Sequence, residues 1–259
     1  MDGVRAIQRG KVWQVGAGPG SPDLLTVRAH RLLESATVVA YDELVTREVL
    51  SIAPAGAERI PVGRRASGSR HHDARIHPLV IERALQGRDV VRLKGGDPLV
   101  FGRGGEEAEE LALAGIAFEL VPGISAALAA AAAMNIPLTH RECASSVTLA
   151  TAHAARAADA GIRPTGEGTL VFYMALGRVE ETCAGLVADG RALDTPAAVV
   201  SRASLPGARI VAGTLGDLGA RVREAALQSP ALLIVGDVVA RRVTSPAPSR
   251  LDAARAATG

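Results

Sequence analysis

Aromatic residues are scarce in this sequence: phenylalanine, tyrosine and tryptophan together make up only 2% of its 259 residues. Charge of one sign is also lacking, because 29 lysine and arginine residues stand against 27 aspartate and glutamate residues. Proteins that bind nucleic acid use a basic surface and, for single strands, aromatic rings on which bases stack. The composition shows neither feature, and we expect no nucleic-acid partner.

Cysteine and long apolar runs are also nearly absent. The two cysteines, Cys143 and Cys183, lie far apart in unrelated segments, which argues against a disulfide framework and favours a reducing cytoplasm. Residues 1–10 carry charges and no apolar core, so they do not read as a signal peptide. The longest apolar stretch, residues 123–136, is too short to span a bilayer. We therefore expect a cytoplasmic protein with no membrane partner.

What the sequence does contain is typical of an α/β fold. Its apolar content of 48%, mostly alanine, valine and leucine, is enough for the buried strands of a parallel sheet. Short runs rich in β-branched residues predict strands at 12–15, 37–41, 58–62, 90–93, 118–121, 147–151, 169–173, 197–201, 209–213 and 231–235. Helices are expected from residue 21 and at 44–51, 79–85, 106–115, 124–134, 178–189 and 215–227.

The length is sufficient for two modest α/β domains. The best boundary is Pro122–Gly123, which gives an N-terminal α/β domain over 1–121 and a C-terminal α/β domain over 122–259. Residues 245–259 have the composition of a disordered tail.

The stretch from Val90 to Glu110 organises the rest of the chain. A β-branched run is followed by Lys94, two glycines, Asp97 and a proline, and then by a second glycine-rich segment around Arg103 that leads into an acidic helix. Glycines let the backbone approach a ligand where a Cβ atom would collide. Asp97 can accept hydrogen bonds from a ligand, and the planar fork of Arg103 matches a carboxylate. This pattern predicts a ligand-binding strand–loop–helix unit.

Two further positions at strand ends point to a ligand. Residues 16–21 form a glycine-rich loop that resembles a dinucleotide fingerprint but lacks its third glycine, so we expect a ligand loop and not a nicotinamide site. Asp42 directly follows a buried strand, at the edge where open parallel sheets bind ligands. Asp42 can also be a helix N-cap, and its position taken alone favours this second interpretation.

A polar loop over residues 63–77 carries several arginines and three histidines. The spacing of the histidines and Asp73 matches no standard zinc pattern, and we predict no metal. A flexible basic loop that collects an acidic substrate is one interpretation, and a plain solvated loop is the other.

Taken together, these segments resemble the tetrapyrrole methylases over almost the whole chain, from about Val12 to Val239. The Gly-Arg-Gly-Gly-Glu-Glu and Leu-Thr-His-Arg segments resemble the branch that acts on uroporphyrinogen III. The resemblance rests on residues 15–20, 23–26, 41–45, 92–98, 101–107, 121–125, 137–141, 171–174 and 231–237.

The resemblance implies two α/β domains with S-adenosylmethionine in the cleft between them, S-adenosylhomocysteine as product, and a homodimer. It also implies two methyl transfers, to C2 and C7 of uroporphyrinogen III, which give precorrin-2 via precorrin-1. Asp42 matches the position assigned as proton acceptor. The positions that match cofactor contacts are Pro19, Gly95, Gly96, Asp97, Val100, Ser125, Ala126, Met174 and Ala203.

The chemistry of such a substrate agrees with these positions. It carries eight carboxylates, so its site needs cations, and Arg64, Arg103 and Arg141 are the candidates. Methyl transfer from a sulfonium needs in-line alignment, which backbone loops can provide. The methylated pyrrole must then lose a proton, so a carboxylate such as Asp42 or Glu106 is useful as the base, with Arg103 and Glu106 in the substrate cleft.

One departure from the family pattern bears on function. Arg64 stands where the family usually has a lysine assigned as proton donor, and an arginine does not give up its proton. Two alternatives therefore stay open: a methylase of a later precorrin, and a protein that binds S-adenosylmethionine or a tetrapyrrole without turnover.

Overall fold

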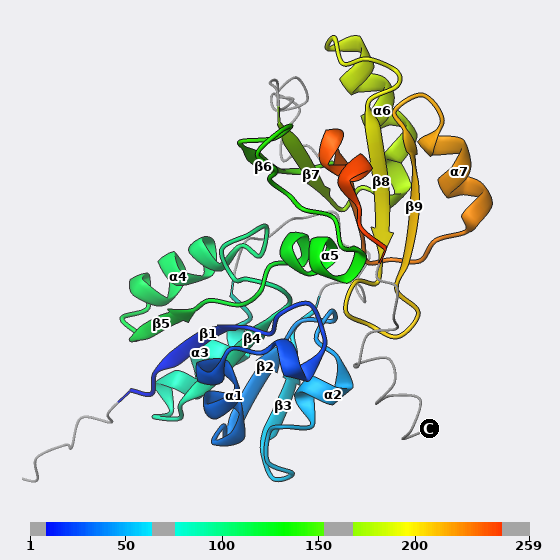
Figure 1. Ribbon diagram of the computed structural model, residues 1–259. Coiled ribbons are helices and arrows are strands. Elements are labelled where there is room, and N and C mark those ends of the chain that lie inside the picture. The colour runs from blue at the N-terminus through cyan, green and yellow to red at the C-terminus, as the bar shows by residue number, and fades with distance from the viewer. Residues whose placement is uncertain (1–8, 64–75, 153–167, 245–259) are drawn as a thin grey trace, which may run out of the picture. The chain divides into compact units, whose positions relative to one another are not determined.

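The computed structural model describes residues 9–63, 76–152 and 168–244 (Figure 1). Contacts between residues divide the chain into two compact units. The first unit is Met1–Ala129 with Ser204–Pro206, and the second is Ala130–Ala203 with Gly207–Gly259. The division lies within helix α5 (Ala126–Met134), while the domain boundary before residue 122 stays a prediction.

The first unit is a five-stranded parallel sheet in the order β3-β2-β4-β1-β5. Neighbouring parallel strands are joined through helices, and the strand order changes direction around β4 and β1, where such sheets bind ligands. The strands are β1 (Val12–Gly16), β2 (Val38–Tyr41), β3 (Glu58–Pro61), β4 (Val90–Lys94) and β5 (Phe118–Val121).

Helices cover both faces of this sheet, as the two buried clusters show. Helices α1 (Val27–Glu34) and α2 (Arg47–Leu50) pack against alternate strand residues such as Val15, Val39 and Leu93. Helices α3 (Pro78–Leu85) and α4 (Gly104–Leu113) pack against the other set, which includes Val12, Val38 and Val90. Because side chains alternate along a strand, β4 sends Arg92 and Lys94 to the α3–α4 face.

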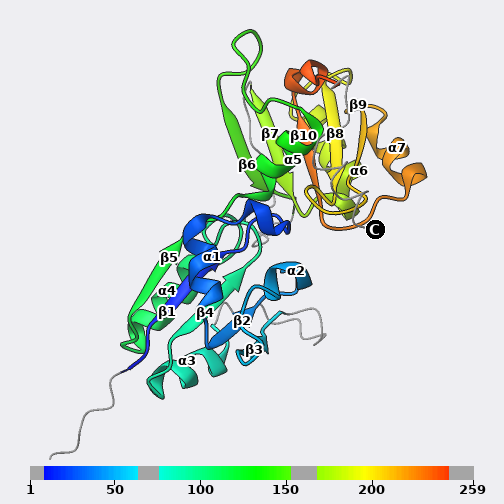
Figure 2. The same cartoon turned by 60° about the horizontal axis from the view of Figure 1, so that its bottom comes forward.

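The second unit contains a mixed sheet in the order β6-β7-β10-β8-β9, in which only the β6–β7 pair is parallel. Helices α6 (Val179–Ala188) and α7 (Leu218–Ala225) share one hydrophobic core with three of its strands (Figure 2). The strands are β6 (Val147–Thr151), β7 (Thr169–Tyr173), β8 (Pro196–Ser201), β9 (Arg209–Thr214) and β10 (Ala231–Val235).

The predicted α/β class is confirmed, and each predicted strand is present within one residue of its expected ends. The interpretation of Asp42 as a helix N-cap is wrong. Helix α2 begins later, at Arg47, and the hydroxyl of Thr46 accepts the hydrogen bond from the Val49 amide. A threonine placed directly before the first helical residue fills the cap and leaves Asp42 available for another contact.

The helix expected from residue 21 is also shorter than predicted. Pro22–Leu24 form a single 3-10 turn, and α1 starts only after Thr26, whose side chain caps it. The predicted tail at 245–259 and most of the basic loop, including Arg64, lie outside the described residues. Within the described ranges, the helices are all too short or too polar to cross a membrane.

Candidate active site

Three strand exits of the first unit meet backbone to backbone. Gly16 ends β1, Gly96 follows β4 and Gly123 follows β5, and we call these three residues the glycine junction. A Cβ atom on Gly16 would lie 2.5 Å from the Gly123 nitrogen and 2.7 Å from the Gly96 oxygen, and one on Gly123 would collide with the Gly96 oxygen. No side chain fits there, so the sequence needs glycine at these positions for steric reasons.

Hydrogen bonds hold the glycine junction together. Gly18 and Gly96 exchange two backbone hydrogen bonds, of 3.1 and 2.7 Å. The Asp97 carboxylate accepts one from the Leu99 amide at 2.8 Å and another from the Gly123 amide at 3.0 Å. The sequence predicted Asp97 as a hydrogen-bond acceptor for a ligand. In the structure it accepts from two backbone amides, and the bond from Gly123 links the β4 and β5 exits.

The second glycine-rich segment folds back onto the first. The Gly104 amide donates to the Pro98 oxygen at 2.9 Å, and a Cβ atom on Gly102 would lie 2.7 Å from the same oxygen. Arg103 between them has a left-handed φ of 57° and precedes α4. The two motifs are thus parts of one loop, whose glycines allow Arg103 to stand at the start of α4.

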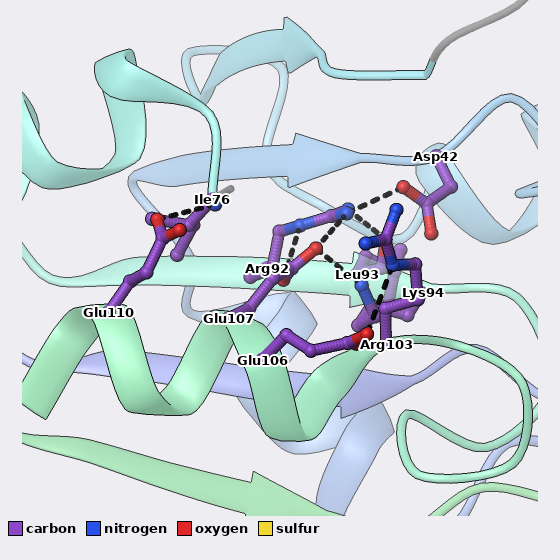
Figure 3. Close-up of polar contacts among 9 residues, drawn as sticks. All are labelled: Asp42, Ile76, Arg92, Leu93, Lys94, Arg103, Glu106, Glu107 and Glu110. Atoms are coloured by element: carbon purple, nitrogen blue, oxygen red, sulfur yellow. Dashed lines mark hydrogen bonds and ion pairs between the residues drawn. The ribbon is translucent and has the colours of Figure 1, made fainter. Parts of the chain in front are cut away.

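A chain of four charged side chains lies on the α3–α4 face of the sheet (Figure 3). The guanidinium of Arg92 binds Glu107 through two nitrogens, at 2.9 and 3.2 Å, and donates to Asp42 Oδ1 at 2.6 Å. Lys94 Nζ donates to Glu107 Oε1 at 2.6 Å. We call Asp42, Arg92, Lys94 and Glu107 the ionic chain.

Burial differs sharply along the ionic chain. The side chains of Arg92, Lys94 and Glu107 are 5%, 2% and 8% exposed, whereas that of Asp42 is 30% exposed. Two positive and two negative charges balance, which is how buried ions are tolerated. Asp42 is thus the solvent-facing end of an otherwise buried, neutral group of charges.

The environment changes the pKa of both buried cations. Burial lowers the pKa of Lys94, and the neighbouring Arg92 charge lowers it further, against the attraction of Glu107. Burial also lowers the pKa of Arg92, but the nearby charges of Asp42 and Glu107 outweigh this effect, so its pKa is raised overall. Arg92 therefore stays a permanent cation that binds two carboxylates.

Arg103 and Glu106 form an ion pair at the first turn of α4, with 3.3 Å between Nε and Oε1. Both side chains are partly exposed, at 38% and 46%. An exposed pair of this kind contributes little to stability, so a carboxylate ligand can displace Glu106 from Arg103 at low cost. The first turn of α4 therefore presents a cation and a carboxylate, drawn in Figure 3 together with Asp42.

The predicted site residues fall into both units. The first unit holds Pro19, Asp42, Gly95, Gly96, Asp97, Val100, Arg103, Glu106, Ser125 and Ala126. In the second unit, Met174 is 52% exposed after β7, with a left-handed φ of 56°, Arg141 is exposed, and Ala203 follows β8. Leu205, which belongs to the first unit by its contacts, lies against Gly20 of the first glycine loop. Across the described residues, no group of three or more histidine, cysteine, aspartate or glutamate side chains is arranged to hold a metal.

Sequence reasoning missed the roles of Arg92, Lys94 and Glu107. All three belong to segments that were singled out, but charged residues inside a buried strand were not treated as a signal. The alternation of β4 places Arg92 and Lys94 on one face, and this pattern, with an acidic helix directly after it, was the clue that the sequence contained.

Comparison with known proteins identifies the family. The model described as Tetrapyrrole (Corrin/Porphyrin) Methylases matches residues 11–219. The chain belongs to this family. Membership confirms the resemblance seen in the sequence motifs.

Among relatives of this methylase, siroheme synthase from Gluconacetobacter diazotrophicus is 46% identical over 245 residues, 92% of this chain and 52% of that protein. The chain thus spans about half the length of the curated relatives it matches. Uroporphyrin-III C-methyltransferase from Thermus thermophilus, solved with S-adenyl homocysteine, is 39% identical with a TM-score of 0.74, covering 90% of this chain and 100% of that one. A cobalt precorrin-4 methyltransferase is 28% identical with a TM-score of 0.76, covering 88% of this chain and 95% of that one.

Proposed function

We propose that this methylase transfers methyl groups from S-adenosylmethionine to C2 and C7 of uroporphyrinogen III, which gives precorrin-2 via precorrin-1. The observation that carries the proposal is the match to uroporphyrin-III C-methyltransferase over the whole of that chain, at 39% identity. The ionic chain supports it, because it presents one accessible carboxylate, Asp42, whose amide donates to Leu93 near the end of β4.

The glycine junction fits the cofactor. Its backbone atoms are bare of side chains, and Gly96 has a left-handed φ of 68° that other residues rarely adopt. S-adenosylmethionine supplies the methyl group, and the loops of the chain fix its position. The residues of the first unit that we assign to the cofactor are Pro19, Gly95, Gly96, Asp97, Val100, Ser125 and Ala126. In the second unit, Met174 and Ala203 are assigned to it from the family resemblance.

Cations are assigned to the carboxylates of the substrate. Arg103 stands at the start of α4, and its ion pair with Glu106 is exposed and weak. Arg103 is therefore available to a substrate carboxylate. Arg141 of the second unit and Arg64 after β3 complete the set. An arginine at position 64 serves as an anchor here and not as a proton donor, because it stays charged.

Asp42 is assigned as the base. Attack of the pyrrole carbon leaves a cationic ring. The methylated carbon is then quaternary and has no hydrogen, so the proton must leave from another position of the macrocycle next to the methylated ring. The Asp42 side chain is partly exposed, and one of its oxygens accepts a hydrogen bond from Arg92. Glu106 lies one helical turn from Arg103 and is the second carboxylate available for this step.

Turnover of uroporphyrinogen III tests the proposal. Purified protein is incubated without oxygen with uroporphyrinogen III and S-adenosylmethionine, and the oxidised product is followed by its absorbance, fluorescence and mass. We expect a dimethylated product that depends on the cofactor and forms far more slowly in Asp42→Asn. Absence of methyl incorporation by protein that still binds S-adenosylhomocysteine would contradict it and would favour a binding role.

A methylase of a later precorrin is the second candidate, supported by the likeness to cobalt precorrin-4 methyltransferase. The same assay with a precorrin-4 substrate separates the two. Methyl transfer to that substrate and none to uroporphyrinogen III selects the second candidate.

We also propose that the protein acts as a homodimer in the cytoplasm and that its product enters sirohaem or cobalamin synthesis. The siroheme synthase relatives support the first route, and the structural likeness to a cobalamin biosynthetic enzyme supports the second. Light scattering of the purified protein tests the dimer.

A further inference from the structure

We propose that Arg92 is a positioning residue for the base: it holds the Asp42 carboxylate by one oxygen and keeps the other turned toward the reacting ring. The inference rests on the proposed function and assigns a role to a buried residue that does not itself reach the substrate. Arg92 acts only through Asp42, and Glu107 and Lys94 hold Arg92 in place.

The strand pattern explains why this contact exists. Ala40 of β2 lies opposite Arg92 of β4 in the parallel register, and Asp42 is the next residue along β2 that points to the same face. The Asp42 amide also donates to the Leu93 oxygen at 3.2 Å, which ties the β2 exit to β4. The backbone thus places the carboxylate directly above the guanidinium.

The hydrogen bonds of Arg92 leave it little freedom. Two of its nitrogens bind Glu107, and a third contact runs from Nη1 to the Leu93 oxygen at 3.2 Å. Glu107 is in turn held by Lys94. A guanidinium fixed at this many points, and 5% exposed, offers Nη2 to Asp42 in one orientation. Figure 3 shows that this bond joins one oxygen of Asp42, while the other oxygen points away from Arg92.

The charges show what Arg92 adds to the ionic chain. Without Arg92, Lys94 and Glu107 would still form a neutral buried pair at 2.6 Å, and Asp42 would be a partly exposed carboxylate on a loop. Arg92 is therefore not needed to neutralise the core. Its particular effect is to connect the buried pair to Asp42.

A double-mutant cycle tests this role. Arg92→Gln is predicted to lower kcat about 10- to 100-fold, since small misplacements of a reacting group have effects of this size. KM for both substrates and the affinity for S-adenosylhomocysteine should change by less than about twofold, because the glycine junction is untouched. In an Asp42→Asn background, the same Arg92→Gln change should alter kcat less than about threefold, because there is no longer a carboxylate to position.

Arg83→Gln is the matched control. Arg83 also binds a carboxylate through its guanidinium, with Nε 3.0 and 3.2 Å from the two oxygens of Glu58, but it lies on α3 away from Asp42. The Arg83→Gln substitution should lower the stability of the protein without changing kcat. If Arg92→Gln does not fold, Arg92→Lys keeps the charge, loses the fork, and is used in the same cycle.

Two results would overturn the inference. Equal losses of kcat from the Arg92 substitution with and without Asp42, or unchanged kcat in a folded Arg92→Gln protein, would show that Arg92 serves only the fold. Absence of methylation by the unsubstituted protein is a different failure. It would refute the proposed function, and this inference with it.

Discussion

Substitution of Gly16 by alanine tests whether the glycine junction is as closed as the structure shows. The added Cβ atom would lie 2.5 Å from the Gly123 nitrogen, 2.6 Å from its Cα and 2.7 Å from the Gly96 oxygen. Unstrained carbon contacts need about 3.5–4.0 Å, so the overlap approaches 1 Å against three backbone atoms. Backbone atoms cannot rotate away as a side chain does, and the strands themselves must separate.

Two effects lower the stability of the Gly16→Ala protein. Overpacking by one methyl group costs about 1–3 kcal/mol. Separation of the β1 and β5 exits also breaks the hydrogen bond from the Gly123 amide to Asp97, which is worth about 1.5–3 kcal/mol because the acceptor is charged. We expect Gly16→Ala to lose about 2.5–6 kcal/mol of stability, a large share of the 5–15 kcal/mol typical of a domain.

Urea unfolding measures the loss of stability, and calorimetric titration of S-adenosylhomocysteine measures the loss of cofactor affinity. Gly56→Ala is the control, since a Cβ atom there meets nothing within 4 Å. The control should unfold and bind like the original protein, whereas Gly16→Ala should be less stable and bind weakly. A Gly16→Ala protein with unchanged stability and affinity would refute the steric argument.

Three further substitutions or reactions probe other parts of the structure. Asp97→Ala removes the acceptor for the amides of Leu99 and of Gly123 in the glycine junction, so the Kd for S-adenosylhomocysteine should rise about 10- to 100-fold in titration calorimetry, and an unchanged Kd would contradict a role of these hydrogen bonds in binding. Arg83 and, to a lesser extent, Arg88 hold the pKa of Glu58 below its ordinary value, so its stabilisation is present above about pH 4.3 and is lost as the pH falls through the folded pKa. Thermal unfolding should therefore show Glu58→Gln losing less stability between neutral and acid pH than the original protein, and equal losses would count against the pairing. Burial raises the pKa of Cys183 to about 11, so mass spectrometry should find it unreacted with iodoacetamide at about pH 8 until the protein unfolds, and rapid labelling of the native protein would contradict its burial.

The sequence predicted local structure better than contacts between distant residues. Strands were found because β-branched runs are a local signal, and the glycine motifs marked loops that do meet at the sheet edge. Gly16, Gly96 and Gly123 illustrate the limit. Gly16 and Gly96 were recognisable as parts of glycine-rich loops, and Gly123 as part of a domain boundary, but only the structure shows that the three exclude side chains from one another.

Asp42 shows why the site itself was only partly predictable. Its position after a strand suggested a helix cap, because the cap depends on nearby residues alone. In the structure Thr46 takes the cap, and Asp42 binds an arginine 50 residues away in sequence. The strand pairing that joins them is set by the whole sheet, and no local pattern encodes it.

The position of the transferred methyl groups tests the central claim most directly. Uroporphyrinogen III is treated with S-adenosylmethionine labelled with carbon-13 in its methyl group, and the product is analysed by NMR. The account predicts two labelled methyl groups, on C2 and C7, and much slower labelling when Asp42 is replaced by asparagine. Label at other ring positions, or none in protein that binds the cofactor, would contradict it.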